Sequence, residues 1–146
     1  MGAIFCLPRY VWKRAESEKL ETMITKVNLA AKLSLFTEQY SPKIIGEVND
    51  LYVKVVKLQG EFVWHHHENE DELFYVIKGA LRMKVREDGR ENEFMIMPGE
   101  FIVIPRGVEH LPSAEEETHI MLLEPKTTLN TGNLVNERTV QELDRI

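Results

Sequence analysis

The stretch WHHHENEDELFYVIKG, residues 64–79, holds three of the five histidines of the chain and ends in an apolar run that closes on a glycine. If residues 61–67 form a β-strand, successive side chains point to opposite faces. His65 and His67 then share one face, and His66 points to the other. Taken alone, the triplet could also be an exposed histidine-rich patch, so its interpretation depends on what lies around it.

Two further residues complete a possible metal site with His65 and His67. Glu72 opens the next apolar strand, and a tight connection would bring it back beside the histidines. His110 follows the Pro-Arg-Gly turn at residues 105–107. Three imidazoles and one carboxylate are a normal ligand set for a divalent transition metal such as Zn, Mn, Fe, Ni or Cu. A cation would also satisfy imidazole lone pairs that burial otherwise leaves without a partner.

Most of the remaining chain indicates short β-strands separated by Gly, Pro, Asn and Asp. Many short strands with regular turn signals predict an all-β sandwich or barrel. Asp88-Gly89 is a good hairpin turn. Apolar residues at helical spacing between Leu20 and Leu35 predict a short N-terminal helical segment. The expected strands, besides residues 61–67, are Ile44–Val48, Leu51–Leu58, Glu72–Ile77, Leu81–Glu87, Asn92–Met97, Phe101–Ile104 and Thr118–Leu123.

The composition favours a single ordinary globular domain. The chain has 146 residues, of which 43% are hydrophobic and 29% charged, and its formal net charge is −6. An acidic chain does not attract nucleic acid or anionic lipid, and no apolar run is long enough to cross a membrane. Cys6 is the only cysteine, which excludes an internal disulfide and fits a cytoplasmic location.

We expect three segments along the chain. Residues 1–22 differ in composition from the rest of the chain and are interpreted as an N-terminal arm without assigned function. Residues 23–126 are expected to hold the helical segment and the barrel. Residues 127–146 are expected to form a C-terminal surface segment, with a final helical turn marked by Val140, Leu143 and Ile146.

The two groups of ligands resemble the paired motifs of the cupin superfamily. The first motif, G-x5-H-x-H-x3,4-E-x6-G, is matched from His65 to Gly79, while the lead from Gly60 is one residue short. The second motif, G-x5-P-x-G-x2-H-x3-N, is matched from Gly99 to His110 but has Ala114 where the pattern has Asn. The chain looks most similar to small single-domain cupins described as mannose-6-phosphate isomerase-like.

That resemblance implies a double-stranded β-helix, or jelly-roll, barrel with the metal bound inside by His65, His67, Glu72 and His110. From the alternation along the strands we expect mostly apolar pocket walls. The expected wall residues are Phe74, Val76, Met83, Phe101, Val103 and His119. The alternation places no lysine or arginine beside the metal, which argues against a sugar phosphate as the substrate.

Three functions are compatible with such a barrel. The first is a metal-dependent enzyme of isomerase, lyase or dioxygenase type acting on a small molecule, with no catalytic base assigned. The second is a barrel that binds or senses a small molecule without turnover. The third is a metal-storing or structural barrel. The strand Glu72–Ile77 is apolar on both faces, so we also expect its outer face to be covered, with a homodimer as the favoured arrangement.

Overall fold

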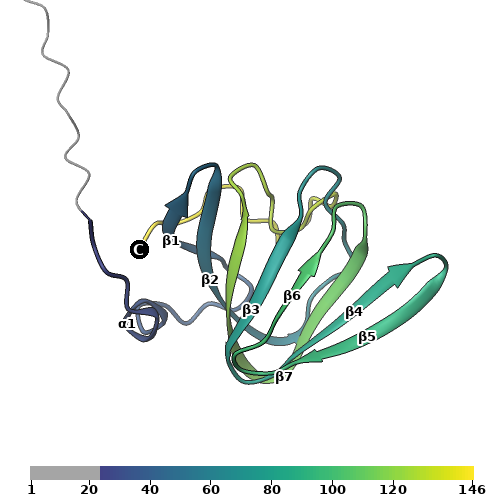
Figure 1. Ribbon diagram of the computed structural model, residues 1–146, viewed down its shortest axis with the longest axis horizontal. Helices are drawn as coiled ribbons and strands as arrows, with labels where there is room; N and C mark the ends of the chain where they lie inside the picture. The colour runs from purple at the N-terminus through teal and green to yellow at the C-terminus, as the bar shows by residue number, and fades with distance from the viewer. Residues whose placement is uncertain (1–23) are drawn as a thin grey trace, which may run out of the picture.

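The computed structural model describes residues 24–146, so the predicted arm at residues 1–22 lies outside the described residues. The fold is an all-β barrel with one short helix, as expected (Figure 1). The elements are α1 (Leu29–Leu33), β1 (Lys43–Val48), β2 (Leu51–Glu61), β3 (Glu72–Lys78), β4 (Leu81–Glu87), β5 (Arg90–Ile96), β6 (Phe101–Ile104) and β7 (Glu109–Pro125). No helix within the described range is long and apolar enough to cross a membrane.

The long strand β7 joins the two halves of the barrel. The first part of β7 pairs with β4, where Met83 lies opposite Pro112, and β4 in turn pairs with β5. The second part of β7 lies between β2 and β3, and β1 and β6 pair at the outer edges in the order β1-β2-β7-β3-β6 (Figure 1). All of these pairings are antiparallel, which is the arrangement of a jelly roll.

The short helical segment predicted between Leu20 and Leu35 is confirmed by α1, which the Asn28 side chain caps. Two other local predictions were wrong. Residues 61–67 do not form a regular strand, because β2 ends at Glu61 and only an isolated bridge at His65 follows. No helical turn forms near residue 146; Arg145 instead bridges to Ile44 in β1.

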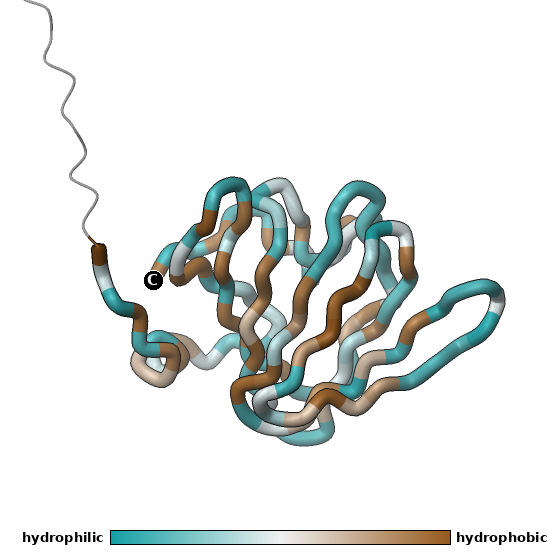
Figure 2. The backbone as a smooth tube through the Cα atoms, in the orientation of Figure 1, coloured by the Kyte–Doolittle hydropathy of each residue, from teal (hydrophilic) through white to brown (hydrophobic). Residues whose placement is uncertain are grey.

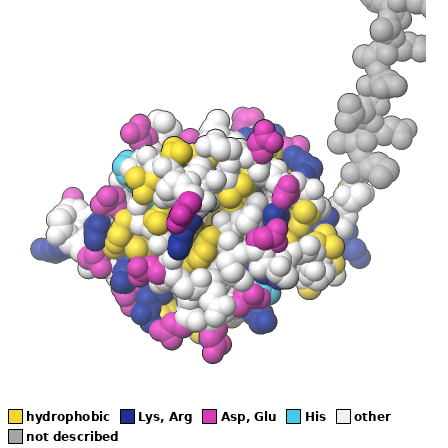
Figure 3. Space-filling model, turned by 180° about the vertical axis from the view of Figure 1, so that it is seen from behind, with side chains coloured by type: hydrophobic (Ala, Val, Ile, Leu, Met, Phe, Trp, Pro, Cys, Tyr) yellow, Lys and Arg dark blue, Asp and Glu magenta, His cyan; other side chains and the backbone are white. Residues whose placement is uncertain are grey.

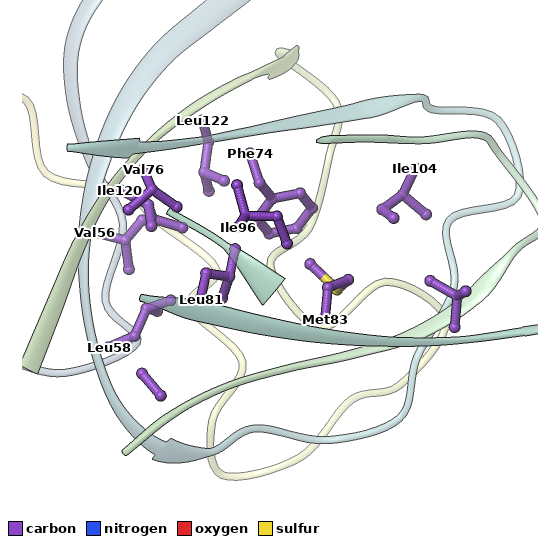
Figure 4. Close-up of a cluster of buried hydrophobic side chains, with 12 residues drawn as sticks. Val56, Leu58, Phe74, Val76, Leu81, Met83, Ile96, Ile104, Ile120 and Leu122 are labelled. Atoms are coloured by element: carbon purple, nitrogen blue, oxygen red, sulfur yellow. The ribbon is translucent and has the colours of Figure 1, made fainter. Parts of the chain in front are cut away.

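The core lies between the two halves of the barrel. Its side chains come from β2 to β7, and Figure 4 shows Phe74 and Leu122 on one side of the core with Leu81 and Met83 on the other. Along the chain, the strands carry most of the hydrophobic residues and the tip of the β4–β5 hairpin is hydrophilic (Figure 2). The tip turns at Asp88-Gly89, where both residues have positive φ, as expected for this hairpin turn.

A second, smaller cluster lies outside the barrel beneath α1. Leu33 and Phe36 pack there with Ile45 and Val55, and Ile77 of β3 contacts the same cluster. Helix α1 therefore covers one end of the outer face of the sheet.

Candidate metal centre

The backbone brings the two histidine segments together directly. The backbone N of His65 donates to the backbone O of His110 at 3.1 Å, and the backbone N of His110 donates to the backbone O of His65 at 2.9 Å. The turn before His110 is held as well, because the backbone N of Gly107 donates to the backbone O of His67 at 2.7 Å. Gly107 has φ +80°, a conformation that L side chains rarely adopt, so glycine suits this turn.

The four predicted ligands converge at one point inside the barrel. One ligand atom from each of His65, His67, Glu72 and His110 lies within 4.8 Å of the other three, and all four residues are buried. Glu72 Oε2 lies 3.2 Å from His67 Nε2 and 3.3 Å from His110 Nε2. None of these three atoms forms a well-aligned hydrogen bond within residues 24–146. Buried acceptors that face one another in this way fit a bound cation.

Backbone carbonyls orient two of the imidazoles. His65 Nδ1 donates to the backbone O of Val63 at 2.9 Å, and His110 Nδ1 donates to the backbone O of Val108 at 3.0 Å. Because a carbonyl can only accept, the proton of each neutral ring is on Nδ1 and the lone pair is on Nε2. This is the tautomer that a metal-binding histidine needs.

Burial and neighbouring groups favour the metal-binding protonation states. Burial, and next the charge of His110, lower the pKa of His65 to about 4, so this imidazole is neutral near pH 7. Burial alone would raise the pKa of Glu72. The contacts with His110 and His67 outweigh burial and hold the pKa of Glu72 well below its usual range. Neutral imidazoles and an ionised carboxylate are the forms that bind a divalent ion.

A small cavity of about 40 Å³ opens beside the ligands, and His65 and Glu72 line it directly. Phe74, predicted as a wall, lines it too. Val76 and Met83 share the inward orientation but are fully buried in the adjoining core and do not reach the cavity. The other apolar walls are Val56, Leu58, Phe62, Ile120 and Leu122.

Three predicted wall residues lie elsewhere, which corrects the expectation for them. Phe101 and Val103 are 62% and 46% exposed, because the inward positions of β6 belong to Ile102 and Ile104. Directly paired residues share a face of the sheet, and in this pairing Ile104 lies opposite Glu72. His119 lies on the outer side of β7, where its Nε2 is 2.8 Å from Glu117 Oε1.

The sequence reasoning missed an ion pair behind the ligands. Lys54 Nζ lies 2.5 Å from Glu124 Oε1, and the two side chains are each 1% exposed. Glu124 lines the same cavity as Glu72, and its Oε2 has no hydrogen-bond partner among the described residues. Burial, and next the charge of Glu72, raise the pKa of Glu124 well above its usual range.

A signal for this pair was present in the alternation of two strands. Lys54 is two residues before Val56 in β2, so both point to the inner face. Glu124 is likewise two residues after Leu122 in β7, and Leu122 lies opposite Lys54 in the pairing of these strands. A charged residue at an inward position of each of two paired strands therefore indicates a buried ion pair.

The C-terminal segment lies against the histidine segment rather than on an unrelated surface. The backbone N of Asn133 donates to the backbone O of His66 at 2.9 Å, and Asn133 Oδ1 accepts from the backbone N of His66 at 3.0 Å. A Cβ at Gly132 would lie 2.2 Å from the backbone O of His66, so only glycine permits this approach. Asn130 also lines the cavity.

Comparison with known proteins agrees with this geometry. The family described as Cupin domain matches residues 52–125, which include all four ligands. The YdbB protein of Bacillus subtilis, described as uncharacterized, is 30% identical over 99 residues, which are 68% of this chain and 85% of that protein. A 3-hydroxyanthranilate 3,4-dioxygenase of Ruegeria pomeroyi is 31% identical over 83 residues, which are 56% of this chain and 46% of that enzyme. The chain thus spans less than half of that dioxygenase.

A solved structure gives the same fold. The crystal structure of a cupin-2 domain containing protein from Shewanella frigidimarina aligns with a TM-score of 0.65 and 45% sequence identity. The alignment covers 68% of this chain and 94% of that one. The part of this chain outside the alignment is therefore about a third of its length.

Proposed function

The chain belongs to the cupin domain family, and from this membership we propose that it is a metal-dependent enzyme that acts on a small molecule, with dioxygenase chemistry as the favoured type. One observation carries the proposal. Four buried ligand atoms converge beside a small cavity with mostly apolar walls, and three of them have no other partner among the described residues. A storage or structural site would not need such a cavity at the metal.

The residues at the site suit this task. His65, His67, Glu72 and His110 would hold one divalent ion, with two of the imidazoles already oriented by backbone carbonyls. The bound ion supplies Lewis-acid chemistry or, if it is iron, activation of dioxygen. Four protein ligands leave one or two open positions on a five- or six-coordinate ion. The apolar walls, Phe74 among them, would exclude bulk water from the reacting molecule.

The dioxygenase type is favoured over the isomerase and lyase types because the curated relatives include enzymes named 3-hydroxyanthranilate 3,4-dioxygenase. The cavity itself adds an argument against a sugar phosphate, since none of the described residues that line it is a lysine or an arginine. The alternative is a barrel that binds a small molecule without turnover. The cavity and its ligands fit that alternative equally, so the experiment must measure turnover.

The test is metal analysis followed by oxygen consumption. Protein purified without a histidine tag is loaded anaerobically with Fe(II) and mixed with catechol, hydroquinone and 2-aminophenol while dissolved oxygen is recorded. We expect one metal ion per chain and oxygen uptake with at least one of these compounds. A protein that binds the metal and the compounds but consumes no oxygen would support the non-catalytic alternative.

Two variants make the test specific to the site. We expect His67→Ala to lower metal affinity by more than about 100-fold, because even partners that only orient a ligand are worth about 10–100-fold. The matched control is His66→Ala, which removes the neighbouring imidazole that is outside the ligand set. If His67→Ala retains one metal ion per chain, the assignment of the site is wrong.

We further propose that the protein works as a homodimer in the cytoplasm, and the outer face of the sheet supports the dimer. Directly paired apolar residues form a continuous patch on β7, β3 and β6, which we call the outer apolar face: Met121, Leu123, Leu73, Tyr75, Phe101 and Val103. Phe101 and Val103 are its most exposed members. Exposed apolar patches of this kind mark association surfaces. Seen from behind, by contrast, hydrophobic side chains lie in small groups between charged ones (Figure 3).

A further inference from the structure

We propose that Tyr40, Phe62 and Arg138 form a stack at the entrance of the cavity and limit the size of the molecule that reaches the metal ligands. The inference rests on the metal-dependent function proposed above and adds the residues that select its ligand. It begins from the volume of the cavity, which is about 40 Å³. A few water molecules fill that space, whereas a cavity that binds benzene measures about 150 Å³. A ring-sized molecule therefore enters only if part of the wall moves.

The three side chains are layered between the solvent and one of the metal ligands. Arg138 is exposed, Tyr40 is half-buried and Phe62 is buried. The Tyr40 and Phe62 rings stack with their centroids 4.8 Å apart, and both residues line the cavity. The Phe62 ring meets the His65 imidazole edge to face, with 5.5 Å between the centroids. The stack thus extends from the surface to the metal ligands.

Arg138 contacts both rings of the stack. Its guanidinium lies 5.7 Å from the centroid of the Tyr40 ring and 5.6 Å from that of Phe62. At these distances a cation is attracted to the face of an aromatic ring. Arg138 Nη1 also donates to the backbone O of Glu61 at 2.8 Å. The guanidinium therefore stabilises the position of the two rings without itself lining the cavity.

The C-terminal segment fixes the position of Arg138 and connects it to the cavity wall. Asn130 lines the cavity, and its Nδ2 donates to the backbone O of Arg138 at 2.8 Å. The backbone N of Arg138 donates to Asn136 Oδ1, also at 2.8 Å. The stack is thus held from outside by contacts of an exposed residue. A ring-sized ligand that displaces the stack has to break these contacts, whereas the buried core of the barrel stays in place.

Tyr40 has a backbone conformation that only its surroundings maintain. Its φ is +55°, in a region that residues other than glycine rarely adopt. Its backbone N donates to the backbone O of Lys57 at 2.8 Å, and its hydroxyl donates to the backbone O of Gly60 at 2.5 Å. Strained residues of this kind are concentrated at ligand clamps and switch regions. The strain favours displacement of the Tyr40 ring once its contact with Arg138 is lost.

The experiment compares two probes that carry the same metal-binding group, acetohydroxamate and benzohydroxamate. They differ in that a phenyl ring replaces a methyl group. The protein is loaded with Co(II), whose visible absorption changes with its ligands, and the association rate of each probe is measured by stopped flow. We expect benzohydroxamate to associate with the wild type at least about tenfold more slowly than acetohydroxamate, because the phenyl ring has to displace the stack.

Two variants and a matched control identify the residues responsible. Arg138→Ala should lower the ratio of the acetohydroxamate rate to the benzohydroxamate rate by about tenfold, the effect of losing two cation–π contacts and one hydrogen bond. Phe62→Leu removes the inner ring and should lower the ratio as well. Arg138 is exposed, so its variant should fold even if Phe62→Leu does not. The control Arg145→Ala removes an exposed arginine that lies 5.7 Å from the Tyr52 ring, away from the cavity, and should leave the ratio unchanged.

Equal association rates of the two probes with the wild type would overturn the proposal, because a ring would then enter without hindrance. It is also overturned if Arg138→Ala keeps the wild-type ratio, or if Arg145→Ala lowers the ratio as much as Arg138→Ala does. If Phe62→Leu alone lowers the ratio, Phe62 limits the size by itself and the role of Arg138 is refuted.

The remaining outcomes separate this proposal from the enzymatic function. A protein that binds Co(II) but neither probe refutes the route from this cavity to the metal. A protein that takes up no Co(II) refutes the metal site and, with it, both proposals. If the rates follow expectation but no compound supports oxygen uptake, the enzymatic function fails and the size limit stands.

Discussion

The two faces of strand β3 differ in burial and in the residues that they present. Its inner face carries Glu72, Phe74 and Val76, which are all buried, whereas Leu73 and Tyr75 on the outer face are half-buried. Inside, the strand places a carboxylate among imidazoles, an arrangement that fits a cation. Outside, it presents apolar residues that a covering surface would stabilise. The same strand therefore serves chemistry on one face and association on the other.

The largest expected difference between the two faces is in how much a Phe→Ala substitution lowers the free energy of unfolding. Phe74→Ala should lower the free energy of unfolding by about 3–5 kcal/mol, because it leaves a cavity in a closely packed core. Phe101→Ala should change the free energy of unfolding of the monomer by only about 0.5 kcal/mol, because Phe101 is 62% exposed. Denaturant titration of both metal-free variants measures the difference. Equal losses would contradict the assignment of faces.

A smaller effect is expected from the pH dependence of the metal-free protein. Folding lowers the pKa of His65 from 6.5 to about 4, so the unfolded chain takes up this proton more readily than the folded one. The contribution of His65 to stability is complete above pH 6.5 and is lost as the pH falls toward 4. The total loss is about 3 kcal/mol.

The measurement is the unfolding free energy at several pH values between 4 and 7. His65→Asn removes the titrating group and should flatten the slope in this range. His66→Asn serves as the control for losing a neighbouring imidazole. The prediction fails if His65→Asn and the wild type lose stability equally as the pH falls.

The smallest effect on monomer stability is expected on the outer apolar face. The double variant Phe101→Glu/Val103→Glu should change the free energy of unfolding of the monomer by no more than about 1 kcal/mol, since both positions are exposed. It should nevertheless convert a dimer into a monomer, because charges in an apolar interface lose their hydration. Light scattering checks the mass, and metal analysis should still give one ion per chain. A wild type that is monomeric at micromolar concentration would contradict the dimer.

Much of the site could be predicted from the sequence, because histidine and glutamate can be recognised as metal ligands by their residue type even where they lie far apart in the chain. The spacing of His65 and His67 allows both imidazoles to reach one point in any extended segment. That is why their convergence was anticipated although the predicted strand 61–67 was wrong. The segment is held instead by two hydrogen bonds between the backbones of His65 and His110.

The pocket walls were harder to predict, because alternation along a strand gives two sets of residues but does not say which set points inward. On β6 the choice of Phe101 and Val103 was wrong, and only the pairing of Ile104 with Glu72 decides it. On β7 the same ambiguity misplaced His119. An expectation of an apolar interior also led us to overlook Lys54 and Glu124, which are buried together as a pair.

The sequence by itself determined the all-β fold and the four residues that converge. Strand alternation, turn residues and the residue types of metal ligands can all be recognised from short stretches of sequence. The tertiary structure alone decided which faces are inside, that residues 130–133 lie against the site, and that Lys54 meets Glu124. The physical reason is that inward and outward are properties of pairing between strands. A charge that is too costly to bury alone becomes stable only where a distant segment supplies its partner.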